Sequence, residues 1–246
     1  MNILHMISLP VNVRALRQWA VNRGFAADEG RALHHLLNEN FGKSVLQPFR
    51  FMVASGARTA TIYAYSPSDA ETLQQIARDF GAPDALAVYN ISQLASKSMP
   101  NKWQVGRRLA FDIRVRPVRR LRRPAGEFRQ QGAEVDAYLL NVLRRLPKDS
   151  CDEMQSELNA PRDQVYAQWL AERFSNAAYI ENVTMTSFER SRVLRGERKS
   201  EGPDVTFQGE LTVRESGRFG QILRSGIGRH KAYGYGMLLL RPPKVT

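Results

Sequence analysis

The sequence predicts an α+β fold of two domains, and three observations support this. The chain has 246 residues, enough for two hydrophobic cores of ordinary domain size. Its hydrophobic content of 43% is that of a globular protein rather than a disordered one. Stretches in which apolar residues alternate, as in strands, are interleaved with stretches of helical spacing. Together these observations predict sheets that are covered by helices.

The first half of the chain predicts one complete set of elements. The expected order is a strand over residues 3–9, helices over 12–24 and 28–40, strands over 49–53 and 59–65, a helix over 68–80 and a strand over 85–91. Pro10 is expected to end the first strand, and Asn12, Asp28 and Ser68 can each cap a helix. This order is that of a ferredoxin-like (RRM-like) module. We therefore expect a ferredoxin-like domain over residues 1–100.

A similar order can be traced in the second half. Strands are expected over residues 107–116, 182–194, 205–213 and 236–241, and helices over 134–146, 163–174 and 217–223. The helical residues between Gly132 and Ala178 exceed what a minimal module holds, so we interpret about 130–178 as an insertion. The fold class is thus two tandem ferredoxin-like domains. The second is expected over residues 101–246, with a helical insertion and a glycine-rich loop at 226–236.

The charge of the chain points to an anionic partner. Lysine and arginine total 36 against 24 aspartate and glutamate residues, a net charge of +12 that suits nucleic acid or another anionic surface. No apolar run approaches 18 residues, so no membrane span is expected. The N-terminus lacks the basic region of a signal peptide, and the lone Cys151 excludes a cysteine-rich zinc site. We expect a cytoplasmic protein without a metal or other cofactor.

The glycine-rich loop, GIGRHKAYGYG over residues 226–236, is the most specific feature of the chain. Glycine lets a backbone approach a phosphate closely, and successive N–H groups in such a turn can bind an anion. We expect phosphate contact from Gly226, Gly228, Arg229, His230 and Gly234. The side chains of His230, Lys231 and Tyr233 could also stabilise charge or donate a proton. The alternative is a flexible loop that only touches phosphates.

The expected helix over residues 28–40 has two different faces. Its leucines share one face, whereas Arg31, His34, His35 and Asn38 fall on the other. An imidazole can take the proton of a ribose 2′-OH, and a guanidinium can hold a phosphate whose charge rises in the transition state. His34 lies at the edge of the apolar stripe and is the preferred base, with His35 as the second candidate. The alternative is that both histidines are ordinary surface residues.

A run of arginines over residues 107–123 is the third feature. Apolar residues alternate with Arg114 and Arg116 in its first part, as in a strand with one basic face. Planar guanidinium groups suit phosphate contacts, and a second basic cluster occurs at residues 190–199. The arginines expected to contact nucleic acid are Arg23, Arg107, Arg108, Arg114, Arg116, Arg119, Arg120, Arg122, Arg123, Arg192 and Arg195.

Three stretches resemble the CRISPR repeat-processing endonucleases of the RAMP superfamily, closest to the branch of type I-E systems and to related type IV enzymes. GIGRHKAYGYGMLLL at 226–240 looks like their glycine-rich loop and last strand, lysine included. RALHHLL at 31–37 is similar to the helix that supplies their catalytic histidine. GAEVDAYL at 132–139, followed by YAQWL at 166–170, resembles their middle segment. One position departs from the family, because several relatives have a tyrosine where this chain has Arg31.

The resemblance implies two ferredoxin-like domains that grip a CRISPR repeat RNA hairpin at its base. Cleavage there would be metal-independent: the 2′-OH attacks the adjacent phosphate and leaves a 2′,3′-cyclic phosphate and a 5′-hydroxyl. Arg31, His34, His35, Lys231 and Tyr233 are the implied catalytic candidates, and other subunits of a CRISPR ribonucleoprotein the implied partners. Two alternatives stay open, namely a non-catalytic guide-RNA-binding subunit and an unrelated basic nucleic-acid-binding protein.

Overall fold

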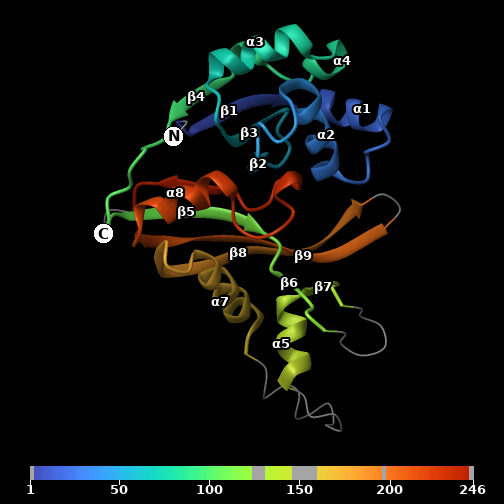
Figure 1. Ribbon diagram of the computed structural model, residues 1–246. Coiled ribbons are helices and arrows are strands. Elements are labelled where there is room, and N and C mark those ends of the chain that lie inside the picture. The colour runs from blue at the N-terminus through green and yellow to red at the C-terminus, as the bar shows by residue number, and fades with distance from the viewer. Residues whose placement is uncertain (1–2, 124–130, 146–159, 196–197, 244–246) are drawn as a thin grey trace.

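Two four-stranded antiparallel sheets, one in each half of the chain, form the frame of the protein (Figure 1). The structure is a computed structural model and describes residues 3–123, 131–145, 160–195 and 198–243. The first hydrophobic core draws on residues 7–94, and the second mainly on residues 103–238. Each sheet therefore has a core of its own.

The N-terminal sheet has the strand order β2-β3-β1-β4. Its strands are β1 (His5–Asn12), β2 (Phe49–Met52), β3 (Thr59–Ser66) and β4 (Ala95–Ser98), and its helices are α1 (Val13–Asn22), α2 (Glu29–Phe41), α3 (Ala70–Phe80) and α4 (Pro83–Leu86), with the 3₁₀ turn η1 (Ile91–Gln93). Read from the β4 edge of the sheet, the four strands have the order 4-1-3-2, and all neighbouring strands pair antiparallel. This arrangement and its crossover helices make the ferredoxin-like module.

The C-terminal sheet repeats that topology with the order β10-β5-β9-β8. Its strands are β5 (Arg108–Val115), β8 (Ala178–Arg195), β9 (Arg198–Val213) and β10 (Leu238–Arg241), with helices α7 (Arg162–Phe174) and α8 (Ser216–Ser225) and the 3₁₀ turn η2 (Lys231–Tyr233). A short hairpin, β6 (Val118–Arg120) with β7 (Glu134–Asp136), precedes helix α5 (Ala137–Arg145). The predicted fold class is confirmed.

Local sequence signals explain the helix starts. The side chains of Asn12 and Asp28 accept hydrogen bonds from the backbone N–H groups of Ala15 and Arg31, as N-caps do. Asp69 rather than Ser68 caps α3. These bonds satisfy backbone donors that a helix start leaves without an intrahelical partner.

Pro10 does not end the first strand. It lies inside β1, and its carbonyl accepts a hydrogen bond from the backbone N–H of Asn90. That bond is on the side of β1 where the pairing with β4, over residues 5–8, has already stopped. The missing N–H of proline therefore costs the sheet no ladder bond.

Two expected elements are wrong in position or type. Residues 85–91 are not a strand, because Pro83 starts the short helix α4 and the fourth strand comes later as β4. Glu134–Asp136 is a strand paired with β6 rather than the start of a helix. The insertion is also smaller than 130–178 by its topology, since α7 occupies the crossover between the first and second strands of the module. Among the residues of this insertion that the structure describes, the additional elements are β6, β7 and α5.

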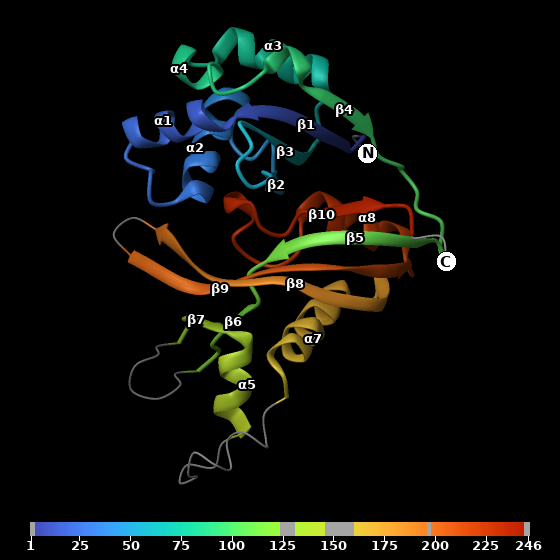
Figure 2. The ribbon, with the colours of Figure 1, turned by 180° about the vertical axis from the view of Figure 1, so that it is seen from behind.

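The two domains meet through side chains of the facing sheets. The Tyr65 hydroxyl on β3 donates to the Leu238 carbonyl on β10 at 2.9 Å, and burial raises the pKa of this tyrosine. Arg50 on β2 lies 3.7 Å from Asp112 and 3.4 Å from the Thr206 hydroxyl of the second sheet. Seen from behind, α5 and the β6–β7 hairpin extend on the side away from the N-terminal domain (Figure 2).

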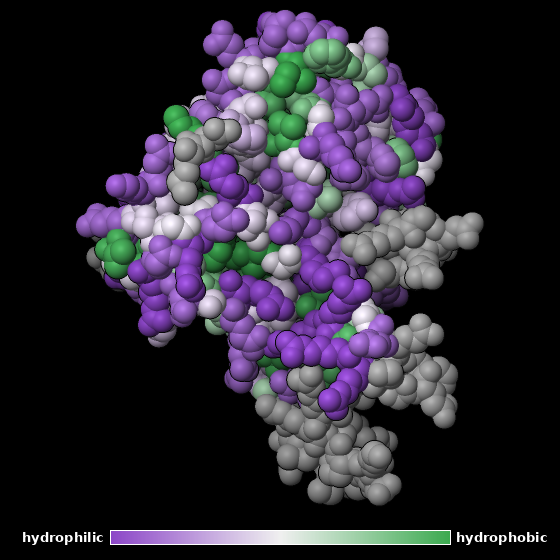
Figure 3. Space-filling model, in the orientation of Figure 1, coloured by the Kyte–Doolittle hydropathy of each residue, from purple (hydrophilic) through white to green (hydrophobic). Residues whose placement is uncertain are grey.

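The face of the molecule seen in Figure 1 is mostly polar. Hydrophilic residues cover most of the face in Figure 3, with hydrophobic residues in small groups between them. In the described part of the chain, no helix combines the length and the apolar character that crossing a membrane requires.

Candidate active site

Helix α2 and the glycine-rich loop lie against each other, although about two hundred residues separate them in the sequence. A Cβ built on Gly30 would stand 2.8 Å from the carbonyl oxygen of Tyr233, so only glycine fits at this crossing. The rings of His34 and Tyr233 have centroids 5.4 Å apart. The fold therefore brings two of the predicted catalytic regions into one place.

His34 faces the glycine-rich loop from a sheltered position. Leu33, Leu36 and Leu37 bury the opposite face of α2, and His34 itself is half-buried. The amide nitrogen of Asn38, one turn later, lies 3.2 Å from the ring nitrogens of His34. Burial lowers the pKa of His34, and the neighbouring His35 lowers it further. The imidazole is thus uncharged near neutral pH, the form in which it can accept a proton.

His35 points in another direction. Its ring stacks on Phe25 with centroids 4.5 Å apart and planes 6° from parallel. The Arg31 guanidinium lies 5.1 Å from the centroid of the same Phe25 ring. Burial and the charge of Arg31 lower the pKa of His35, which nevertheless remains exposed. The two candidate histidines therefore have different surroundings, and only His34 is in ring contact with the loop residue Tyr233.

The glycines of the loop are needed for close packing inside the protein. Gly226, Gly228 and Gly234 have φ values of +69°, +78° and +85°, which favour glycine. Cβ atoms built on them would meet Pro48 at 3.0 Å, Trp169 at 3.0 Å and Phe49 at 3.2 Å, respectively. The sequence alone suggested room for a phosphate. In the structure the Cβ positions of these glycines are against side chains of both domains.

One carboxylate holds the first part of the loop. Glu134 on β7 accepts from Arg229 Nε at 2.6 Å and lies 2.6 Å from His230 Nε2. The hydrogen bond with His230 lowers the pKa of Glu134 to about 2, and Arg229 adds to the effect. The His230 side chain is only 2% exposed and its backbone is left-handed, with φ of 60°. Sequence spacing carries no signal for a pairing between residues so far apart in the chain.

Lys231 and Tyr233 lie in the turn that follows. Both belong to η2, and both side chains are half-buried. Since η2 crosses α2 at Gly30, Tyr233 lies beside His34, and Lys231 is two residues before it in the same turn. They remain candidates for stabilising charge or for donating a proton.

Two predicted nucleic-acid contacts turn inward. Arg116 is 1% exposed and bonds to Ser191, and Arg114 forms a two-pronged pair with Asp204 at 2.8 and 2.5 Å. Both guanidinium groups lie over the ring of Tyr235, at 5.7 and 4.7 Å. Both side chains are therefore engaged by other groups of the second domain. Arg116 is buried inside the protein, which does not fit the expected phosphate contact, whereas the Arg114 side chain is 29% exposed and its expected contact with nucleic acid stays a prediction.

The other predicted arginines differ in their partners. Arg119 pairs with Glu172, Arg108 with Glu181 and Glu210, and Arg23 with Glu39 and Asp84, while Arg120 donates to the Gly132 carbonyl. Arg107, Arg122 and Arg123 are exposed. Arg192 and Arg195 lie on β8, and their side chains are outside the described part of the structure.

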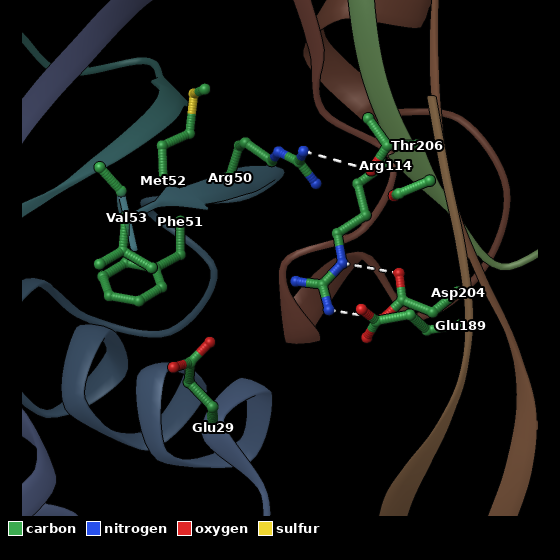
Figure 4. A pocket seen from close by; sticks show the side chains of 11 residues that line it. Glu29, Arg50, Phe51, Met52, Val53, Arg114, Glu189, Asp204 and Thr206 are labelled. Atoms are coloured by element: carbon green, nitrogen blue, oxygen red, sulfur yellow. Dashed lines mark hydrogen bonds and ion pairs between the residues drawn. The ribbon is translucent and has the colours of Figure 1, made fainter. Parts of the chain in front are cut away.

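A cleft of about 490 Å³ opens between the domains near the first turn of α2. Figure 4 shows Glu29 and Arg50 entering it from the N-terminal domain and Arg114 and Asp204 from the second sheet. Burial raises the pKa of Glu29. Groups of both signs line the cleft, and sequence reasoning singled out only Arg114 among these four. Within the described ranges, no cluster of three or more histidine, cysteine, aspartate or glutamate side chains is placed to hold a metal ion.

Comparison with known proteins gives a family and a fold. The profile of the family described as "CRISPR associated protein" matches residues 4–242. The Cascade subunit CasE of Escherichia coli K12 is 27% identical over 150 residues, which are 61% of this chain and 65% of CasE. Thermus thermophilus Cse3 bound to an RNA that represents a pre-cleavage complex has a similar structure. Its TM-score is 0.65 at 19% identity, over 98% of this chain and all of that one.

The crystal structure of Cas6e from Escherichia coli K-12 is similar as well. Its TM-score is 0.59 at 19% identity, over 97% of this chain and all of that one. At these identities the structural matches support the fold, with both sheets included in the aligned length.

Proposed function

This chain belongs to the CRISPR-associated protein family, and from that premise we propose that it is an endoribonuclease that cleaves CRISPR precursor RNA within the repeat, at the base of a hairpin. The observation that carries the proposal is the placement of His34 against Tyr233 of the glycine-rich loop. A general base and a phenol are thereby brought together in a strongly basic protein, and Lys231 belongs to the same turn as the phenol. The names of CasE and Cse3, a subunit of Cascade and an RNA-bound endoribonuclease, are consistent with this activity.

The residues of the site can carry out a transesterification without a metal ion. His34 takes the proton of the ribose 2′-OH, and the 2′-oxygen attacks the adjacent phosphorus. The bond to the 5′-oxygen breaks, and Lys231 or Tyr233 supplies the proton that this oxygen needs. The products are a 2′,3′-cyclic phosphate and a 5′-hydroxyl. Alignment of the attacking oxygen, phosphorus and leaving oxygen supplies much of the rate increase.

Exposed arginines of the second domain would hold the RNA. Arg122 and Arg123 follow β6, and Arg229 stands at the start of the glycine-rich loop. Duplex RNA hides its base edges in a deep, narrow groove, so proteins bind it mainly through backbone charge and shape. We propose that the protein keeps the processed guide RNA and joins other subunits of a CRISPR ribonucleoprotein.

The presence of an arginine at position 31 supports a second candidate function, that of a guide-RNA-binding subunit without catalytic activity. In several enzymes of the family that the sequence resembles, a tyrosine occupies this position, and here the Arg31 guanidinium lies over Phe25. We favour the enzyme, because Tyr233 places a phenol beside His34 from another part of the chain.

Incubation of the purified protein with its repeat hairpin in EDTA tests the proposal. We expect cleavage with a 2′,3′-cyclic phosphate end, and no cleavage of an RNA with a 2′-deoxy nucleotide at the scissile position. His34→Ala should lower the single-turnover rate by about 10²-fold or more, the usual effect of losing a general base. Its affinity for the 2′-deoxy RNA should stay close to that of the wild type. Tight binding without products would instead support the non-catalytic subunit.

A further inference from the structure

Phe25 and His35 form a stacked pair beside the candidate active site. The loop between α1 and α2 holds Phe25 in place: its backbone N–H donates to Ala20 at 2.7 Å, and its carbonyl accepts from Asp28 at 3.0 Å. Its ring also packs on Trp19, with centroids 6.0 Å apart. Phe25 is therefore a half-buried ring held in a fixed position, and the His35 ring stacks on it.

The position of His35 suits a contact with a ligand better than a role in the core. Phe25 covers one face of the imidazole, and the side chain is exposed to solution. The leucines that anchor α2 are on the opposite side of the helix. An exposed aromatic ring held flat against a second ring is a platform of the kind on which unpaired bases stack.

The surroundings of the pair carry the charge that such a contact needs. The Arg31 guanidinium lies over the Phe25 ring, and a cation at that place can pair with the phosphate of a stacked nucleotide. The nearest acid on the same helix, Glu39, is already paired with Arg23 at 3.2 Å. The ring of His35 is 5.4 Å from that of His34, so a base on the platform would adjoin the phosphate that His34 serves.

We propose that His35, backed by Phe25, is a stacking subsite for one unpaired nucleobase next to the scissile phosphate. This inference rests on the proposed function, because an RNA cut at the base of a hairpin continues into an unpaired nucleotide there. It assigns different roles to the two histidines. His34 acts on the reacting atoms, whereas His35 binds the flanking base and Arg31 its phosphate.

Binding to an uncleavable 2′-deoxy repeat hairpin tests the subsite separately from cleavage. His35→Ala should weaken binding about 5- to 150-fold, the range for removing one base–aromatic stack. His35→Phe keeps a flat ring and should bind like the wild type. An RNA with an abasic nucleotide in place of the flanking one should bind the wild type more weakly by the same factor. His35→Ala should bind this abasic RNA as weakly as it binds the complete RNA, because the stack is already lost. Phe80→Ala, which removes a remote ring that is 77% exposed, is the matched control.

The outcomes separate the two proposals. Independent, multiplying effects of His35→Ala and of the abasic nucleotide would overturn the subsite, as would an equal defect in His35→Phe and His35→Ala. The abasic RNA tests the wild-type protein, so the result does not depend on how a variant folds. Absence of cleavage of the ordinary repeat by the wild type, with the subsite results as expected, would overturn the proposed endonuclease alone.

Discussion

At the scale of single residues, two adjacent histidines acquire different properties from their neighbours. His34 is partly buried with its ring against that of Tyr233, whereas His35 is exposed and lies flat on Phe25. Burial removes water that would stabilise a charged imidazole, so the pKa of His34 is lowered. A base with a lowered pKa stays ready to accept a proton at mildly acid pH.

This shift predicts the pH dependence of cleavage. The active form of His34 is the neutral one, and its pKa is below the ordinary value of 6.5. The single-turnover rate should therefore be insensitive to His34 protonation above about pH 6.5 and fall about tenfold per pH unit well below the lowered pKa. Rates measured from about pH 4.5 to 8 on the repeat hairpin check this. If the pH–rate profile had its midpoint above pH 6.5, another group would limit the rate. The same conclusion would follow if the rate of His34→Ala fell in the same way at acid pH.

At the scale of elements, β7 and the glycine-rich loop are joined by Glu134. The carboxylate is 2.6 Å from both Arg229 Nε and His230 Nε2, and it lies in the hairpin that leads to the exposed Arg122 and Arg123. Charge-assisted hydrogen bonds are shorter and stronger than neutral ones. The hairpin that we propose to bind RNA is thereby connected to the turn that carries Lys231 and Tyr233.

Glu134→Gln tests this connection. A hydrogen bond to a charged group contributes about 1.5–3 kcal/mol, so loosening the loop should slow cleavage by about tenfold or more. Affinity for the 2′-deoxy RNA should change less than the rate does. Glu172→Gln is the matched control, since Glu172 also binds an arginine of the hairpin, Arg119, at 2.7 Å but is not bonded to the loop. Equal rates in the two variants would contradict a positioning role for Glu134.

At the scale of the whole molecule, fewer arginines are available to an anionic partner than the net charge of +12 suggests. Of the predicted arginines, Arg114 and Arg116 help to hold the second domain together, and several others are paired with acids on the surface. Surface pairs of this kind contribute little to stability and remain accessible to a phosphate. Arg122 and Arg123, which follow β6, are exposed.

The salt dependence of RNA binding tests this surface. Replacing Arg122 and Arg123 together with alanine should weaken binding and reduce the slope of log K against log salt by about 1 for each phosphate that the variant no longer neutralises. The double variant Arg78→Ala/Lys97→Ala removes the same charge on α3 and β4, at the opposite end of the molecule, and should leave the slope nearly unchanged. Equal slopes in both double variants would mean that the effect is one of net charge alone.

Much of the fold follows from local patterns. The caps at Asn12 and Asp28, the alternation in β5 and the paired runs of β8 and β9 are properties of neighbouring residues, so the sequence predicted them. The position of β4 was missed because this short, exposed strand is defined by its pairing with β1 rather than by an apolar pattern of its own.

The sequence by itself determined the α+β class, the doubled element order and the leucine-backed helix with Arg31, His34 and His35, since each depends on periodicity within a few turns or strands. Only the tertiary structure decided which histidine faces Tyr233, that Arg116 is buried and that Glu134 holds Arg229 and His230. These contacts join residues far apart in the chain. Burial and charge pairing arise only when the two sheets and the loop pack together, and no local spacing records them.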